Sequence, residues 1–185
     1  MNISKGQAEK IRRFCIDFYK TLDFAHHIEH MNRTVRIAEY IARKENVNLQ
    51  IARLGAMVHQ FHDNMDKLRA FLDKINLDSQ IAERLLECAK FRPLKKKTGK
   101  RASIEAMVVF DADALQVIGP HGIVREIACN IGARNKAFDR SIEDARETES
   151  LFYKSLQTKT ARKLAKKPYE LTRKFWKEYY KAKLP

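Results

Sequence analysis

The chain has 185 residues, of which 44% are apolar and 32% are charged, a balance that is typical of a globular protein and excludes a disordered chain. Six glycines and four prolines are too few for the many turns of an all-β sandwich, so the composition favours helices. The formal net charge of +14 favours anionic partners such as nucleotides, nucleic acid or phosphorylated metabolites, although a generally basic composition explains it equally well.

The cysteines are odd in number and far apart, at Cys15, Cys88 and Cys129. No CxxC pair occurs, so neither a disulfide framework nor a zinc knuckle is expected. The sequence also shows no signal peptide and no apolar run of about 18 residues. We therefore expect a cytoplasmic protein that does not span a membrane.

Apolar residues recur at helical spacing through the first half of the chain. The pattern predicts helices at about Lys5–Leu22, Ile28–Glu45, Leu49–His59, Met65–Lys74 and Ser79–Lys90. The third of these is nearly all apolar toward its end, which is typical of a helix buried in the core.

The clearest loop is RPLKKKTGKR, Arg92–Arg101, which contains six lysines and arginines. It is long enough to be a lid, but a solvated charged turn is the simpler interpretation. Further helices are expected at Ser103–Val117, Ile123–Ile131, Phe138–Leu156 and Thr160–Lys183, with a turn at Gly119–Gly122 and an interruption at Pro168. We expect one all-α domain over residues 1–185.

Five of the six histidines lie between His26 and His62. His27 and His30 are three residues apart and share a helical face. His59, His62 and Asp63 also share a face if their helix continues past His59. Because His59 ends the most apolar helix, its side chain must be neutral, paired or coordinated.

Asp111 and Asp113 lie in the apolar run MVVFDADALQVIG. Two carboxylates in such a run are costly unless a positive charge meets them. Lysine or arginine could supply that charge, and so could a divalent cation, since imidazole and carboxylate oxygen are a common ligand set. A core histidine that is hydrogen-bonded to a backbone carbonyl is nevertheless commoner than a metal ligand. The sequence has no G-x-S-x-G motif and no phosphate-binding glycine loop.

At these residues the sequence resembles the HD-domain superfamily of metal-dependent phosphohydrolases, in particular its small bacterial and archaeal branch that looks like nucleotide phosphohydrolases. HIEHMNRT (His27–Thr34) is similar to the family's H-x-x-H-x-x-R-V, and LGAMVHQ (Leu54–Gln60) is similar to L-A-A-L-L-H-D. FDADALQVIGPHGIVREI (Phe110–Ile127) is similar to Q-D-A-D-R-L-D-A-I-G-A-I-G-I-A-R. The resemblance implies an HD-domain-like helical bundle.

The resemblance also implies a set of site residues. A divalent cation (Mn, Mg, Fe, Co or Ni) would be held by His30, His59 and Asp113. Asp63 or Asp111 would orient the attacking water or accept its proton. Alternative or neighbouring ligands would be His27, Gln60 and His62. Phosphate oxygens would be bound by Arg33, Lys67 and the loop Lys95–Arg101.

The chain departs from the family pattern at three positions. Gln60 replaces the aspartate of the defining doublet, Ala89 replaces a histidine before the basic loop, and Ala114 replaces an arginine. A neutral amide should lower the affinity for a cation. A shifted site of His30, His59, Asp63 and Asp113, with His62 nearby, could compensate; a relic pocket held together by hydrogen bonds and water is the competing interpretation.

Two functions follow. The first is a metal-dependent phosphohydrolase that acts on a nucleotide or another small phosphate ester, with a weakened or shifted metal site. The alternative is a catalytically degenerate HD-fold protein that binds a nucleotide or nucleic acid without turnover. Aromatic residues interleave with lysine and arginine in Thr160–Lys183, a pattern that suits nucleic acid. However, Leu164, Leu171, Phe175 and Tyr179 form one stripe, which favours an amphipathic core helix instead.

Overall fold

The computed structural model describes residues 3–94 and 102–182. Within these ranges the regular structure is entirely helical, with nine α-helices and one 3-10 helix, which confirms the all-α prediction. Most of the predicted basic loop, residues 95–101, lies outside the described residues. No described helix is both long enough and apolar enough to cross a membrane.

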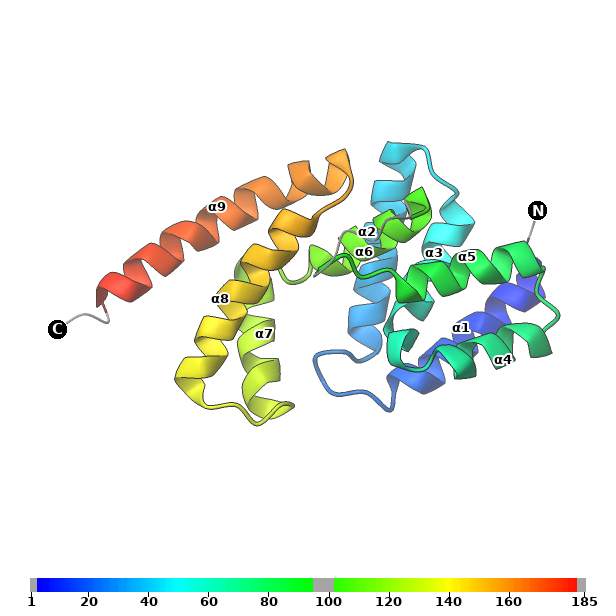
Figure 1. Cartoon of the computed structure of the whole chain (residues 1–185), viewed down its shortest axis with the longest axis horizontal. Coiled ribbons are helices and arrows are strands. Elements are labelled where there is room, and N and C mark those ends of the chain that lie inside the picture. The colour runs from blue at the N-terminus through cyan, green and yellow to red at the C-terminus, as the bar shows by residue number, and fades with distance from the viewer. Residues whose placement is uncertain (1–2, 95–101, 183–185) are drawn as a thin grey trace. The chain divides into compact units, whose positions relative to one another are not determined.

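The backbone divides into two compact units at the link between Asp113 and Ala114. The first unit contains α1 (Lys5–Tyr19), α2 (Ile28–Glu45), α3 (Leu49–Val58), the 3-10 helix η1 (His59–Asp63), α4 (Met65–Lys74), α5 (Ser79–Lys90) and α6 (Ile104–Ala114), whose last residue begins the second unit (Figure 1). The second unit contains α7 (Pro120–Gly132), α8 (Phe138–Ser155) and α9 (Lys159–Ala182). That all 185 residues form one domain stays a prediction.

Short polar side chains define several helix ends in the first unit. Ser4 begins α1 with a capping box, in which its hydroxyl accepts the backbone N–H of Gln7. Asn48 and Asp78 cap α3 and α5 in the same way through their side-chain oxygens. Asn46 ends α2 in the left-handed conformation, at φ 54°. These caps explain why α2 and α5 keep the bounds that the sequence predicts.

Helix α3 packs against both α2 and α5 in the first unit. Its buried residues include Ala52, Leu54, Ala56 and Val58. Gly55 allows the close approach, because a Cβ atom at this position would lie 2.7 Å from the Cys88 Sγ of α5 and 3.0 Å from a Val109 methyl of α6. The apolar helix therefore brings its carboxyl end, where His59 follows, into the centre of the unit.

In the second unit α8 packs against α7 and α9 around a small core of Ile123, Ile142 and Trp176. The predicted interruption at Pro168 is wrong, since α9 continues through it. The predicted buried stripe of α9 is wrong at three of its four residues: Leu164, Leu171 and Phe175 are exposed, whereas Tyr179 is partly buried against this core. The residues that α9 buries instead are Ala161, Ala165, Thr172 and Trp176.

Three other predicted bounds differ from the structure by more than one residue. Helix α1 ends at Tyr19 instead of Leu22, and α6 ends at Ala114 instead of Val117. Helix α7 begins at Pro120, inside the predicted turn. Proline is well suited to the first position of a helix, because the N–H that it lacks would have no intrahelical partner there.

Candidate metal centre

Three side chains from distant parts of the first unit meet in its interior. His30 comes from α2, His59 begins η1 and Asp113 lies near the end of α6. All three are buried, and one potential ligand atom from each lies within 4.8 Å of the others. The Nε2 atoms of His30 and His59 are 3.1 Å apart. The Asp113 Oδ1 lies 3.3 Å from the first of these nitrogens and 3.7 Å from the second.

The His59 ring is held by its other nitrogen. Its Nδ1 lies 2.7 Å from the carbonyl oxygen of Ala56, one turn earlier. Nδ1–H donates to this carbonyl, so the proton of the neutral ring sits on Nδ1. The Nε2 lone pair then faces His30 and Asp113, which is the orientation that a metal ligand requires.

Tyr19 is a second contact of the His59 ring and was not singled out from the sequence. Its hydroxyl lies 3.0 Å from His59 Nδ1, and the backbone N–H of Gln60 also donates to it. The Tyr19 side chain is fully buried. It thus touches both residues of the His59–Gln60 doublet from α1. A tyrosine on the apolar face of the first helix is no distinctive sequence signal for such a contact.

The charge states of the group suit cation binding. Burial lowers the pKa of His59 to about 3, so its ring is neutral near pH 7. Burial alone would raise the pKa of Asp113, but the hydrogen bond with His30 and the charge interactions with His59, His30 and Arg92 together outweigh it and keep this pKa well below its ordinary value. Asp113 is therefore an ionised carboxylate beside a neutral imidazole.

Gln60 reaches the same point from η1. Its side-chain Nε2 lies 3.1 Å from the Nε2 of His59 and 3.3 Å from that of His30. If the side-chain amide of Gln60 were flipped by about 180°, its oxygen would face the two histidine nitrogens in place of its NH₂ group. Gln60, which stands where the family has an aspartate, therefore points toward His30 and His59.

The donor set fits a divalent transition-metal ion. Two ligands at about 2.1 Å from one ion lie roughly 3.0 Å apart at a right angle and about 3.4 Å apart in a tetrahedral arrangement. The separations of 3.1, 3.3 and 3.7 Å between the three donor atoms are close to these values. Two imidazoles with one carboxylate are also a ligand set that such ions accept.

The structure does not bring Asp63 and His62 into this group. The α-helix ends at Val58, and the 3-10 turn that follows has about three residues per turn. Asp63 therefore does not share the face of His59, as a continuing α-helix would require. Its side chain is 85% exposed and pairs with His62 at 3.2 Å.

Asp111 is fully buried, yet it is not one of the three grouped residues. It lies two residues before Asp113 on α6, and residues at this spacing face different sides of a helix. The helical spacing that brings Asp113 to the histidines thus directs Asp111 elsewhere.

The other predicted residues are not among the three grouped side chains. His27 precedes α2 at its N-cap without a side-chain capping bond. Arg33 is half-buried on α2. Lys67 of α4 extends over the ring of Phe18, with its Nζ 5.5 Å from the ring centroid.

A small cavity of about 10 Å³ adjoins the group on the side of Ala89. This volume is close to the least that one water molecule needs. His59 and Asp113 line the cavity together with Ala89, Arg92 and four apolar or sulfur-bearing residues, which are Cys88, Phe91, Val109 and Phe110. Arg92 was not singled out from the sequence, and its positive charge helps to lower the pKa of both Asp113 and His59.

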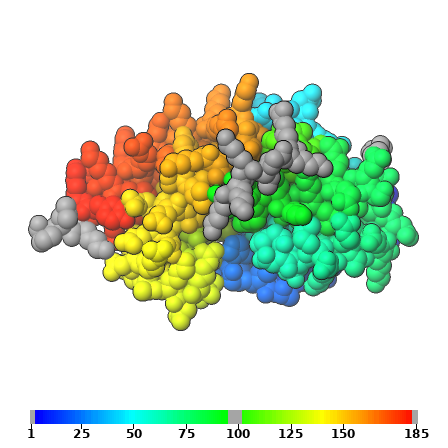
Figure 2. Space-filling view, viewed as in Figure 1, coloured from blue at the N-terminus to red at the C-terminus, as the bar shows by residue number. Residues whose placement is uncertain are grey.

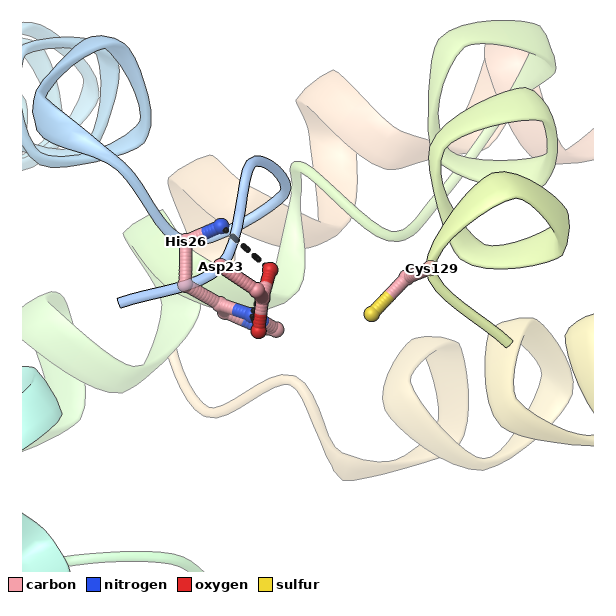
Figure 3. A group of neighbouring side chains, drawn as sticks. All are labelled: Asp23, His26 and Cys129. Atoms are coloured by element: carbon pink, nitrogen blue, oxygen red, sulfur yellow. Dashed lines mark hydrogen bonds and ion pairs between the residues drawn. The ribbon is translucent and has the colours of Figure 1, made fainter. Parts of the chain in front are cut away.

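A second histidine–aspartate pair lies just before α2. The Asp23 carboxylate lies beside His26 (Figure 3) and accepts from its Nδ1 at 2.9 Å. It also accepts from the backbone N–H of Ala25 at 2.8 Å. The sulfur drawn in the same figure belongs to Cys129 of α7, in the second unit. The hydrogen bonds of Asp23 close the turn that leads into α2.

The buried thiols are poor candidates for a nucleophile. Burial raises the pKa of Cys15 and of Cys88 well above the ordinary thiol value. Both remain protonated near pH 7, whereas the thiolate is the reactive form.

Comparison with solved structures identifies the class of fold. An HD-superfamily hydrolase from Bacillus thuringiensis matches with a TM-score of 0.73 at 21% identity, over 96% of this chain and 97% of that one. A Lactobacillus plantarum protein matches with a TM-score of 0.87 at 21% identity, over 98% of each chain. No protein-family model matches the chain. The chain has the helical fold of the HD superfamily, as the sequence predicts.

A more similar sequence is that of the Bacillus subtilis (strain 168) protein YpgQ. It is 30% identical over 131 residues, which span 64% of this chain and 64% of YpgQ's own length. A crystal structure of YpgQ in complex with ADP matches with a TM-score of 0.74 at 25% identity, over 95% of this chain and 97% of that one.

Proposed function

We propose that the chain is a metal-dependent phosphohydrolase that acts on a nucleotide or another small phosphate ester. The observation that carries this proposal is the buried group of His30, His59 and Asp113, in which a neutral imidazole and an ionised carboxylate converge. The HD-superfamily fold and the ADP bound by the similar protein YpgQ support the reaction class and the nucleotide.

The two histidines would hold the ion through Nε2, and Asp113 would supply the negative charge. The Ala56 carbonyl and the Tyr19 hydroxyl keep the His59 ring turned toward the site. A bound divalent cation would lower the pKa of a coordinated water and polarise a phosphoryl oxygen. The Gln60 amide would offer a fourth, uncharged donor from its oxygen.

Arg92 is our candidate for binding the substrate phosphate. It shares the small cavity with His59 and Asp113, and its guanidinium forms no ion pair with another described residue. A planar guanidinium can bind a phosphate through two parallel hydrogen bonds. It would provide positive charge beside the position where Ala89 replaces the family's histidine. The phosphate-binding roles of Arg33 and Lys67 stay predictions.

The catalytic roles of Asp63 and Asp111 stay predictions as well. Asp63 is exposed and paired with His62, so a role for it would require η1 to change its conformation. Asp111 is buried two residues from Asp113, so a role for it would require it to act through that ligand. We therefore assign the proton acceptor to neither residue.

The test begins with metal analysis of protein that has been purified without a chelator. Hydrolysis of nucleotides and phosphomonoesters is then measured with added Mn²⁺ or Mg²⁺. Asp113→Asn removes the charge of the only carboxylate in the group with almost no change in shape. We expect it to abolish turnover, while Asp17→Asn on the exposed face of α1 leaves turnover unchanged.

Two results would count against the proposal. Turnover that survives Asp113→Asn would point to a contaminating enzyme. Saturable binding of ADP without any turnover, in protein loaded with each metal, would instead support the degenerate binder that is the alternative.

A further inference from the structure

Helices α8 and α9 enclose a groove of about 510 Å³ in the second unit. Figure 2 shows the side chains of these two helices, coloured yellow to red, at the surface. The groove is lined by Arg146, Glu147, Glu149, Ser150, Leu151 and Lys154 of α8 and by Tyr169, Arg173 and Trp176 of α9. Its volume is in the range of small-molecule binding sites. It shares no residue with the candidate metal centre.

Three cations line this groove without a carboxylate partner. Neither Arg146, Lys154 nor Arg173 forms an ion pair with any residue that the structure describes. Arg146 lies over the ring of Tyr180, at 5.1 Å from its centroid. Unpaired cations from two helices around one groove favour an anionic ligand.

The groove also contains two carboxylates, and one of them is fully engaged. Glu149 is buried and accepts from the Gly119 backbone N–H at 2.8 Å, the Thr172 hydroxyl at 2.6 Å and the Trp176 Nε1–H at 3.1 Å. The bonds to Thr172 and Trp176 join α8 to α9. Glu147 is exposed, as Arg146, Lys154 and Arg173 are, so it offsets one of the three positive charges of the groove.

The wider charge of the second unit has the same sign. From Ala114 to the end, the sequence has 16 lysines and arginines and 8 aspartates and glutamates, a net charge of +8. The remaining lining is aromatic and apolar, with the Tyr169 ring stacked on Tyr153 at 3.8 Å between centroids. An aromatic wall beside arginines suits a ligand that carries both a flat ring and a phosphate.

We propose that this groove is a second binding site and that it takes an organic phosphate. The arginines and Lys154 bind the phosphate oxygens, and the ring of the ligand lies against Tyr169, next to the edge of the buried Trp176. The site is independent of the proposed hydrolysis, since it uses no residue of the first unit.

The only tryptophan of the chain provides the test, because Trp176 lines the groove. The full chain is titrated with ADP, with inorganic pyrophosphate and with adenosine, without added metal, and tryptophan fluorescence is followed. We expect saturable changes with ADP and with pyrophosphate, but not with adenosine. Lys154→Gln and Arg173→Gln should each weaken ADP binding about tenfold, the usual effect of losing one charge-assisted hydrogen bond.

Lys177→Gln is the matched control, since it removes an exposed charge of α9 that does not line the groove. Circular dichroism checks that each variant keeps its helices. The proposal is overturned if no phosphate changes the fluorescence, or if adenosine binds as tightly as ADP. It is also overturned if Lys177→Gln weakens binding as much as Lys154→Gln, because the effect would then be one of general charge.

Discussion

Gln60 is the residue at which this chain departs most directly from the HD pattern, and its amide faces both histidines. The number of charged ligands sets the affinity of a site for a cation. We expect Gln60→Asp to strengthen Mn²⁺ binding by about tenfold, since it adds a second carboxylate. Calorimetric titration of the metal-free protein measures the change.

Gln80→Asp is the control for Gln60→Asp, because Gln80 is exposed in the first turn of α5. It adds the same charge to the same unit. If both variants strengthen Mn²⁺ binding equally, the gain comes from net charge, and Gln60 has no special position.

Tyr19 is the residue that we expect to orient His59. Groups that hydrogen-bond to a metal-ligating histidine usually contribute about 10- to 100-fold to metal affinity. Tyr19→Phe keeps the buried ring and removes only the hydroxyl at 3.0 Å from Nδ1. We expect Mn²⁺ affinity to fall by about tenfold, as measured by the same titration.

Tyr40→Phe makes the same chemical change on the exposed face of α2 and should leave affinity unaltered. An unchanged affinity in Tyr19→Phe would show that the Ala56 carbonyl alone orients the ring.

The contact of Tyr19 with His59 could not be predicted from the sequence, because it depends on how α1 packs against a helix that begins 30 residues further on.

At the scale of elements, Gly55 controls how closely α3 approaches α5 and α6. A methyl group at this position would lie 2.7 Å from Cys88 Sγ and 3.0 Å from Val109 Cγ2. Overpacking of this kind usually costs about 1–3 kcal/mol. The higher helix propensity of alanine offsets up to about 1 kcal/mol of this cost. We therefore expect Gly55→Ala to lower the free energy of unfolding by up to about 2 kcal/mol, as measured by urea denaturation.

Gly6→Ala is the matched control, because a Cβ at Gly6 near the start of α1 would meet no atom closer than 4.0 Å. Alanine also has the higher helix propensity, so this variant should be at least as stable as the natural chain. Equal stability of the two variants would mean that α3 can move away from α5 without cost.

The sequence predicted three helices of the first unit within their observed bounds. The bounds of α2, α4 and α5 agree with the prediction. The change to a 3-10 helix at His59 was missed, because apolar periodicity does not distinguish the two helix types over five residues. The continuation of α9 through Pro168 was missed because a proline normally ends or kinks a helix.

The buried face of α9 shows a further limit of pattern reasoning. Leu164, Leu171 and Phe175 are hydrophobic but exposed, whereas α9 buries Trp176 together with the smaller residues Ala161, Ala165 and Thr172. Small side chains allow α8 to approach closely, and Thr172 is needed to bond Glu149. Burial is therefore decided by close packing and by a buried carboxylate, which a hydrophobicity pattern does not contain.

At the scale of the whole molecule, the HD resemblance predicted the meeting of His30, His59 and Asp113 across 83 residues of sequence. Spacing alone could not have done so, because the three lie on separate helices. The same resemblance predicted that Asp63 or Asp111 orients the attacking water or accepts its proton. The structure brings neither residue into the group. Motifs thus predicted three residues that the fold brings together, while the 3-10 turn η1 keeps Asp63 away from them.

The central claim is that this buried group holds one divalent cation. The most direct measurement is anomalous diffraction from crystals of the full chain grown or soaked with Mn²⁺, with data collected near the manganese edge. The account predicts one strong anomalous peak within bonding distance of His30 Nε2, His59 Nε2 and an Asp113 carboxylate oxygen. The account would be contradicted if Mn²⁺ bound at other sites in the same crystals and no anomalous peak lay between these three side chains.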